Sequence, residues 1–142
     1  MKTDEIKKLS GEGATLTTTT GACKFCGQSS VVEVPEEWKG GDTDEYISEK
    51  CECSEARIYT TKKRTIEKSE ETIEYQFGEN AAKGEVNPDT RDLLMNCVKM
   101  MLEDQISKVT VDINAQTKAT INYTDKGIKI KRSDKEEEER MV

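Results

Sequence analysis

Two cysteine motifs constrain the fold of this chain more than any other feature. Cys23 and Cys26 lie in the run Cys-Lys-Phe-Cys-Gly, and Cys51 and Cys53 form a second, tighter pair further on. Two thiolates from each of two turns supply the tetrahedral ligand set of a structural zinc site. Gly27 suits the first turn, because a residue without Cβ can take positive φ and turn backbone N–H groups toward sulfur. We therefore predict one Zn²⁺ ion bound by the four cysteines.

Other roles for the cysteines stay open at this point. A thioredoxin-like redox pair at Cys23 and Cys26 is disfavoured, because no βαβ pattern surrounds it and a second pair follows. Disulfides of a secreted domain are disfavoured because Cys97 is left over on another element. Four thiolates leave no open position for a catalytic water, so a metal here would be structural. Iron suits the same ligands as zinc, and the Cys51-Glu52-Cys53 spacing requires an unusual turn.

The composition argues against one large apolar core. Only 33% of the 142 residues are hydrophobic, whereas 36% are charged, which is a low apolar content for a single globular core. Metal ligation can replace missing apolar burial in a small unit. We therefore predict the α+β fold class, with a metal-stabilised module beside a small core of helix and sheet.

The lack of histidine narrows the function. With no histidine in the chain, Ser–His and Cys–His catalysis are excluded and the commonest general base is missing, so we expect no enzyme. The net charge of −7 disfavours a general binder of phosphate backbones. The sequence has no N-terminal apolar segment and no apolar run of membrane length, so we expect a cytoplasmic protein without a membrane partner.

The N-terminal half is predicted to hold the metal. Residues 1–20 are expected to be flexible, with a short frayed helix and then a threonine-rich linker. Residues 21–77 are predicted to be a zinc-ribbon-like module followed by a long charged helix. In the module, residues 30–34 read as a strand, and residues 46–50 return to the second cysteine pair as a second strand or a short helix. The long helix is expected from the N-cap Ser54 to Phe77.

The C-terminal half is predicted to be a second domain. Residues 78–87 read as the linker between the two domains. Asn87 and Pro88 then provide a cap and a first helical residue for a helix that extends to about residue 106. Three stretches of alternating apolar and polar residues follow, which predicts a three-stranded antiparallel meander, with its apolar face against that helix, over the domain 88–132. Residues 133–142 form a charged tail that we expect to be disordered.

Two features are candidate protein-binding surfaces. Trp38, the only tryptophan, is either a lid over the zinc module or an exposed partner anchor. Ile58, Ile66 and Ile73 form a thin apolar stripe on the long helix, which suits pairing with a second copy, pairing with a partner, or packing within its own domain.

Two basic clusters are candidate nucleic-acid contacts. The first is Lys62, Lys63 and Arg64 on the long helix, where the glutamates that follow favour a solvated face of mixed charge. The second is on the polar face of the meander, where three lysines face a single Asp112: Lys118, Lys129 and Lys131. This face is either solvated or a contact surface.

The order of these motifs resembles a known group of proteins. The chain resembles small uncharacterised four-cysteine proteins of phages and mobile elements of low-GC Gram-positive bacteria. The resemblance rests on the run Cys23-Lys24-Phe25-Cys26-Gly27-Gln28, on Cys51-Glu52-Cys53 followed by the charged helix, and on residues 108–113 and 126–133 of the meander. The resemblance implies a phage setting, a bacterial host cytoplasm and a four-cysteine metal site. It implies no catalytic residues.

Two functions follow as hypotheses. The first is a non-enzymatic, zinc-stabilised module that binds a protein, with a host or defence factor as a plausible target and a homodimer as a further possibility. The second is a zinc-ribbon protein that binds nucleic acid through the lysines named above, together with Lys24. The net charge disfavours the second.

Overall fold

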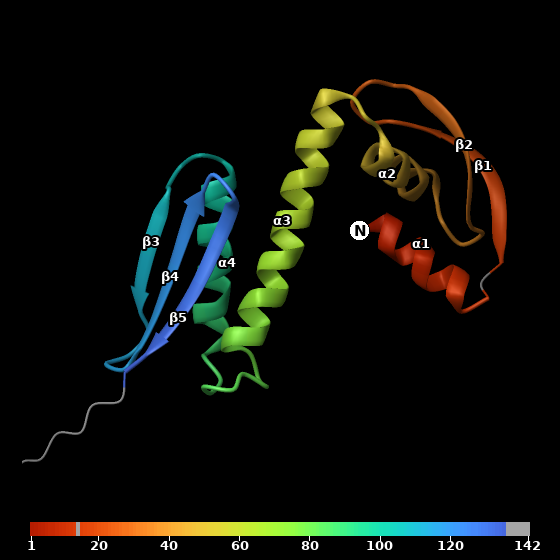
Figure 1. Ribbon diagram of the computed structural model, residues 1–142. Helices are drawn as coiled ribbons and strands as arrows, with labels where there is room; N and C mark the ends of the chain where they lie inside the picture. Colours follow the sequence, from red (N-terminus) through yellow and green to blue (C-terminus); the bar gives the residue numbers. More distant parts are fainter. Residues whose placement is uncertain (14, 136–142) are drawn as a thin grey trace, which may run out of the picture. The chain divides into compact units, whose positions relative to one another are not determined.

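The computed structural model describes residues 1–13 and 15–135, and over these residues the chain is α+β with four helices and two separate antiparallel sheets (Figure 1). The chain forms two compact units, Met1–Arg64 and Thr65–Val142. The division falls inside helix α3 (Ser54–Phe77). None of the helices in the described residues is long and apolar enough to cross a membrane.

The first unit is built on a β-hairpin with a helix against it. Strands β1 (Leu16–Ala22) and β2 (Ser29–Pro35) pair antiparallel, with Thr20 opposite Val31. Helix α2 (Gly40–Lys50) lies so close to β1 that a Cβ on Gly21 would be 2.8 Å from the Ile47 side chain. The Asp44 carboxylate accepts the Ala22 backbone N–H at 2.9 Å. The missing side chain of Gly21 therefore lets α2 pack on the hairpin.

The expectation for residues 1–20 is met in part, because the short helix is present but the threonine-rich segment is a strand and not a linker. Helix α1 spans Lys2–Gly11, and β1 begins at Leu16. The N-terminus of α1 is held by the Glu49 carboxylate, which accepts the backbone N–H groups of Lys2 and Thr3 at 3.1 and 3.2 Å. The threonines of β1 suit a strand because they are β-branched. Both elements contact partners far along the chain, and in the case of β1 the local sequence does not reveal the strand.

The predicted hairpin between the two cysteine pairs is also different in the structure. Residues 30–34 are a strand as expected, but their partner is β1, which precedes the first cysteine pair. Residues 46–50 are the end of α2, so the helical alternative is correct there. The two strands of the hairpin therefore flank the first cysteine turn, and helix α2 leads to the second pair. The expected zinc ribbon would instead have a hairpin between the two pairs.

The second unit contains the predicted helix and meander. Helix α4 (Pro88–Leu102) starts at the Asn87 cap, whose side chain accepts the Asp89 N–H at 2.8 Å. It is followed by β3 (Lys108–Asp112), β4 (Thr117–Thr124) and β5 (Gly127–Asp134) in the order β3-β4-β5. Strand β5 extends into the predicted tail, and residues 136–142 of that tail lie outside the described residues.

The core of the second unit includes the end of α3. Ile73 and Phe77 are buried there against α4 and β4, in a cluster completed by Val86, Leu94, Cys97, Val98, Met101, Leu102, Ala119 and Ile121. The Val86 N–H donates to the Phe77 carbonyl at 2.8 Å. Residues 78–87, predicted as the linker between domains, are therefore a loop of the second unit.

Candidate metal centre

The first cysteine turn is the tip of the β1–β2 hairpin. The Cys23 N–H donates to the Gln28 carbonyl at 3.0 Å, and the Gly27 N–H donates to the Cys23 carbonyl at 3.0 Å. Gly27 has a φ of 76°, the left-handed conformation that its lack of a Cβ permits. The Phe25 N–H is 3.4 Å from the Cys23 sulfur. The turn therefore directs a backbone amide at a thiolate, as its sequence predicts.

The second pair joins two helices. Cys51 ends α2, and its N–H donates to the Ile47 carbonyl at 2.9 Å. Cys53 directly precedes α3, and its carbonyl accepts the Arg57 N–H at 3.0 Å. A helix N-terminus favours a thiolate. The tight Cys-x-Cys spacing is thus explained by two helix ends that are separated by the single residue Glu52.

The four sulfur atoms lie within 4.8 Å of one another. The Sγ atoms of Cys23 and Cys53 are 3.9 Å apart, and those of Cys26 and Cys51 are 3.5 Å apart. Thiolates around a tetrahedral zinc would be about 3.8 Å apart, since a Zn–S bond is about 2.3 Å long. All four cysteines are free thiols. The predicted ligand set is therefore brought together in a geometry that can hold a metal ion.

The electrostatics of the site favour a bound cation. Burial opposes ionisation of Cys23, but hydrogen bonds from the backbone of Cys26 and Phe25 lower its pKa to about 6. At Cys53 the Ala56 backbone N–H favours the thiolate, yet burial and the neighbouring cysteines raise the pKa to about 11. Ionisation of one thiol therefore raises the free-energy cost of ionising the next one. A divalent cation allows all four to be ionised together.

A charged cluster, missed in the sequence, connects the first turn to both helices. It consists of Lys24, Glu45, Glu49, Tyr59 and Lys63. The Glu45 carboxylate accepts hydrogen bonds from both lysine ammonium groups and from the Tyr59 hydroxyl. Burial opposes its ionisation, but these three donors outweigh burial and lower the pKa of Glu45 to about 2. The cluster thereby clamps the cysteine turn to α2 and α3.

Glu49 extends this cluster to α1. Its buried carboxylate lies 3.6 Å from the Lys63 ammonium and accepts two backbone N–H groups of α1. The signal in the sequence is two pairs at i,i+4 spacing. Glu45 and Glu49 place two carboxylates on one face of α2, and Tyr59 and Lys63 place two hydrogen-bond donors on one face of α3. No pattern in the local sequence shows that these faces of α2 and α3 contact each other.

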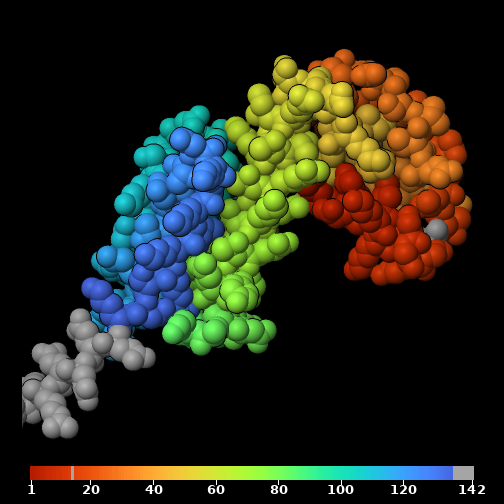
Figure 2. All heavy atoms as spheres, viewed as in Figure 1, coloured from red at the N-terminus to blue at the C-terminus, as the bar shows by residue number. Residues whose placement is uncertain are grey.

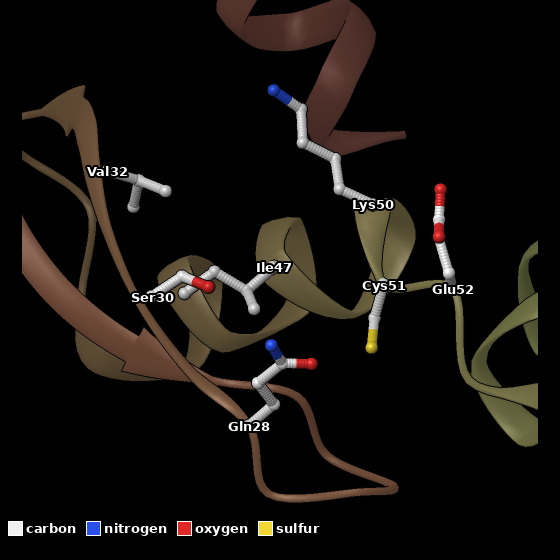
Figure 3. Close-up of a pocket in the computed structure, with 7 residues that line it drawn as sticks. All are labelled: Gln28, Ser30, Val32, Ile47, Lys50, Cys51 and Glu52. Atoms are coloured by element: carbon white, nitrogen blue, oxygen red, sulfur yellow. The ribbon is translucent and has the colours of Figure 1, made fainter.

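A cavity of about 330 Å³ opens beside Cys51 of the four-cysteine cluster (Figure 3). It is lined by Gln28, Ser30, Val32, Ile47, Lys50, Cys51 and Glu52. Figure 3 shows the Cys51 thiol and the Gln28 amide directed toward each other, while the Lys50 side chain extends away from them. Cys51 therefore borders open space, in keeping with its half-buried side chain.

The side chain of Trp38 packs against other residues of the first unit. Its Nε1 donates to the Glu5 carboxylate at 3.2 Å, and its ring meets Tyr46 edge-on at 5.9 Å. The Lys2 ammonium lies 5.0 Å from the ring centroid. Trp38 therefore helps to hold α1 against α2, which neither of its two sequence interpretations anticipated.

The apolar stripe of α3 is not one exposed surface. Ile58 is 59% exposed, Ile66 packs beside the core of the second unit, and Ile73 is buried in that core. Of the alternatives for this stripe, packing within its own domain is therefore the one that applies to Ile73, and a partner contact at this position is excluded by its burial. Cys97, as predicted, is a buried small apolar residue of the second unit, and burial raises its pKa.

The basic residues have different surroundings. Lys63 is engaged in the charged cluster, Lys62 is half-buried, and Arg64 is exposed. On the sheet, the strand registers place Lys118, Lys129 and Lys131 on one face with Lys108. In Figure 2 the near surface of this sheet, blue and teal, has no helix over it.

Comparisons of the chain with protein-family models, with curated proteins and with solved structures each gave no match. The resemblance to four-cysteine phage proteins stays a prediction.

Proposed function

We propose that this protein is a non-enzymatic protein-interaction module whose first unit is stabilised by one Zn²⁺ ion at Cys23, Cys26, Cys51 and Cys53. The observation that carries the proposal is the set of four free thiols within 4.8 Å, supplied by two separate turns. Four protein ligands fill a tetrahedral zinc, so the ion would be structural and not catalytic.

The chemistry of the remaining residues supports a role without catalysis. The chain has no histidine. The two buried carboxylates of the first unit, Glu45 and Glu49, are both occupied by lysines and backbone donors. Glu45, whose partners lower its pKa to about 2, is a poor general acid or base near neutral pH.

The charge of the chain supports a basic partner. With a net charge of −7, an acidic surface can attract the basic groove of a nucleic-acid-binding host or defence protein. Within the phage setting that the resemblance implies, such a partner would be met in the bacterial cytoplasm. Ile58 and Val31, which are both exposed in the first unit, are candidate apolar contacts for a partner.

The metal and the partner are tested with one set of proteins. Purified wild-type protein, Cys51→Ser and Cys97→Ala are analysed for zinc and iron and then used to capture proteins from a bacterial lysate. We expect one zinc per chain and a shared captured protein for the wild type and Cys97→Ala, and loss of both for Cys51→Ser. Equal specific capture by all three proteins would reject zinc as the support of the binding surface, and no specific capture by any of them would reject the interaction role.

A second candidate function is nucleic-acid binding by the polar face of the β3–β5 sheet. The observation that favours it is the set of exposed lysines at Lys108, Lys118, Lys129 and Lys131, with only Asp112 as a counter-charge. Binding through this face would weaken steeply with salt. It would also weaken in Lys118→Ala/Lys131→Ala, with Lys126→Ala as the control on a neighbouring turn. No binding of DNA or RNA at low salt would reject it.

A further inference from the structure

The β3–β4–β5 sheet has two edges that differ in how they are protected. At the β5 edge, the Gln76 side chain of α3 donates to the Ile130 carbonyl at 3.3 Å, so a backbone acceptor of this edge is already used. At the β3 edge, no strand of the described residues pairs with the outer side. An open edge strand is a template for pairing with another chain.

The backbone of β3 presents three residues to that open edge. The Tyr123 N–H donates to the Ser107 carbonyl at 2.9 Å, and the Ile113 N–H donates to the Thr117 carbonyl at 2.9 Å. Because hydrogen-bonding direction alternates along an antiparallel strand, residues 107, 109, 111 and 113 bond toward β4. The peptide groups of Lys108, Thr110 and Asp112 therefore point outward.

The sequence of β3 is complementary to itself. Antiparallel pairing of two copies about a two-fold axis at Thr110 places Lys108 opposite Asp112 of the second copy, and the reverse pair forms on the other side of the axis. Val109 then lies opposite Val111 of the second copy on the apolar face. Opposite charges and β-branched pairs across strands both stabilise such a contact, and a two-fold interface is self-complementary in this manner.

The β5 edge lacks this complementarity. A copy of β5 paired with itself near Ile130 would bring Lys129 against Lys131, and like charges directly opposite each other are destabilising. Lysines of this kind are a common protection of edge strands. The charge pattern therefore selects β3 and not β5.

Apolar surface beside β3 adds to the contact. Val109 and Val111 are only half-buried, whereas Ala119 and Ile121 on the middle strand are completely buried. On α4, Leu93 and Met100 are 49% and 40% exposed. At 100° per residue they lie on the flank opposite Met95, which lines a cavity together with Glu70 and Ile73 of α3. The exposed flank of α4 is therefore turned away from α3, whose Gln76 contacts the β5 edge.

We propose that the chain forms a homodimer by antiparallel pairing of β3 with β3 of a second copy, which joins two sheets of three strands into one of six. The dimer surface belongs to the second unit and contains no metal ligand. It therefore goes beyond the proposed function and does not depend on it.

The test uses the full chain and two charge-reversal variants. Sedimentation or light scattering across a dilution series should give wild-type protein a mass of twice the 16.0 kDa of the chain. Lys108→Glu alone and Asp112→Lys alone should each be monomers. In a dimer of either variant, residues 108 and 112 of the two copies would carry like charges and face each other on both sides of the axis. Their mixture should recover a dimer. In the mixed pair, the two introduced side chains carry opposite charges and face each other, and the native Asp112 of one chain faces the native Lys108 of the other.

A matched control and a second variant keep the test decisive. Lys108 and Lys129 both flank Asn122, but on opposite edges of the sheet, so Lys129→Glu should leave the dimer intact. Thr110→Pro removes an outward N–H without loss of a hydrogen bond to β4 and should give a folded monomer by circular dichroism. A monomeric wild type, a dimeric Lys108→Glu variant, or a mixture that stays monomeric would each overturn the proposal.

Discussion

The two units of this chain are stabilised by different means. In the second unit, buried apolar side chains run from Ile73 and Phe77 on α3 through α4 to Ile121 on β4. In the first unit the buried apolar cluster around the cysteines is small, with Cys23, Ile47 and Ala56 at its centre. Its other connections are thiols, ion pairs and hydrogen bonds. In a chain with little apolar content, charged contacts and the metal ligation that we propose would take the place of one large core.

Loss of the proposed metal site is expected to have the largest effect, and this effect should be confined to the first unit. Cys23→Ser removes a buried ligand, and structural zinc contributes about 10 kcal/mol or more to the folding of small zinc domains. We expect amide NMR signals of residues 15–64 to lose their dispersion, while those of β3, β4 and β5 stay in place. Cys97→Ala should retain the metal and both sets of signals. Loss of β-sheet signals in Cys23→Ser would mean that the units do not fold independently.

The converse substitution acts on the apolar core. Phe77 is completely buried, so Phe77→Ala should destabilise the second unit by about 3–5 kcal/mol. Chemical denaturation followed at that unit measures this, and the metal content should remain unchanged. Tyr75→Ala is the control on the same helix, because Tyr75 is 82% exposed, and its effect should be within about 0.5 kcal/mol. Metal loss in Phe77→Ala would contradict the division.

The charged cluster predicts a smaller effect that depends on pH. The folded pKa of Glu45, about 2, lies below its ordinary value of 4.5. Its contribution is therefore complete above pH 4.5 and is lost as the pH falls toward 2. Glu45→Gln should destabilise the first unit at pH 7 by about 1–3 kcal/mol, and the difference from wild type should shrink between pH 4.5 and 2.

Acid also protonates thiols, so the control for Glu45 is a variant that leaves the site intact. Glu33→Gln, on an exposed strand position of the same unit, should follow the wild-type pH curve. A Glu45→Gln variant with wild-type stability at pH 7 would show that the cluster contributes nothing.

The smallest effect concerns a helix cap of the second unit. Asn87→Ala removes the acceptor of the Asp89 N–H and should cost about 1 kcal/mol. Thermal unfolding of the second unit measures the loss, with Asn96→Ala on the exposed face of α4 as the control. An equal effect of both substitutions would mean that the cap is not stabilising.

The features that could be predicted are those with local signals. The spacing of the four cysteines predicts that they form one site, and the strict alternation of apolar and polar residues predicts strands β3, β4 and β5. Strand β1 was not predicted because its partner β2 is required to form it, and the contact between α1 and the distant Glu49 also has no local signal. The sequence left the role of Ile73 open, because a helical stripe does not reveal which surface covers it. The charged cluster required knowledge of which helix faces meet.

Titration of metal-free protein with Co²⁺ under reducing conditions tests the central claim most directly. Cobalt takes tetrahedral thiolate sites and reports them by its absorption. We predict saturation at one equivalent with intense tetrahedral and thiolate charge-transfer bands, displacement by Zn²⁺, and the appearance of dispersed signals from residues 15–64 in step with binding. A pale octahedral spectrum, or a first unit that is already folded without metal, would contradict the account.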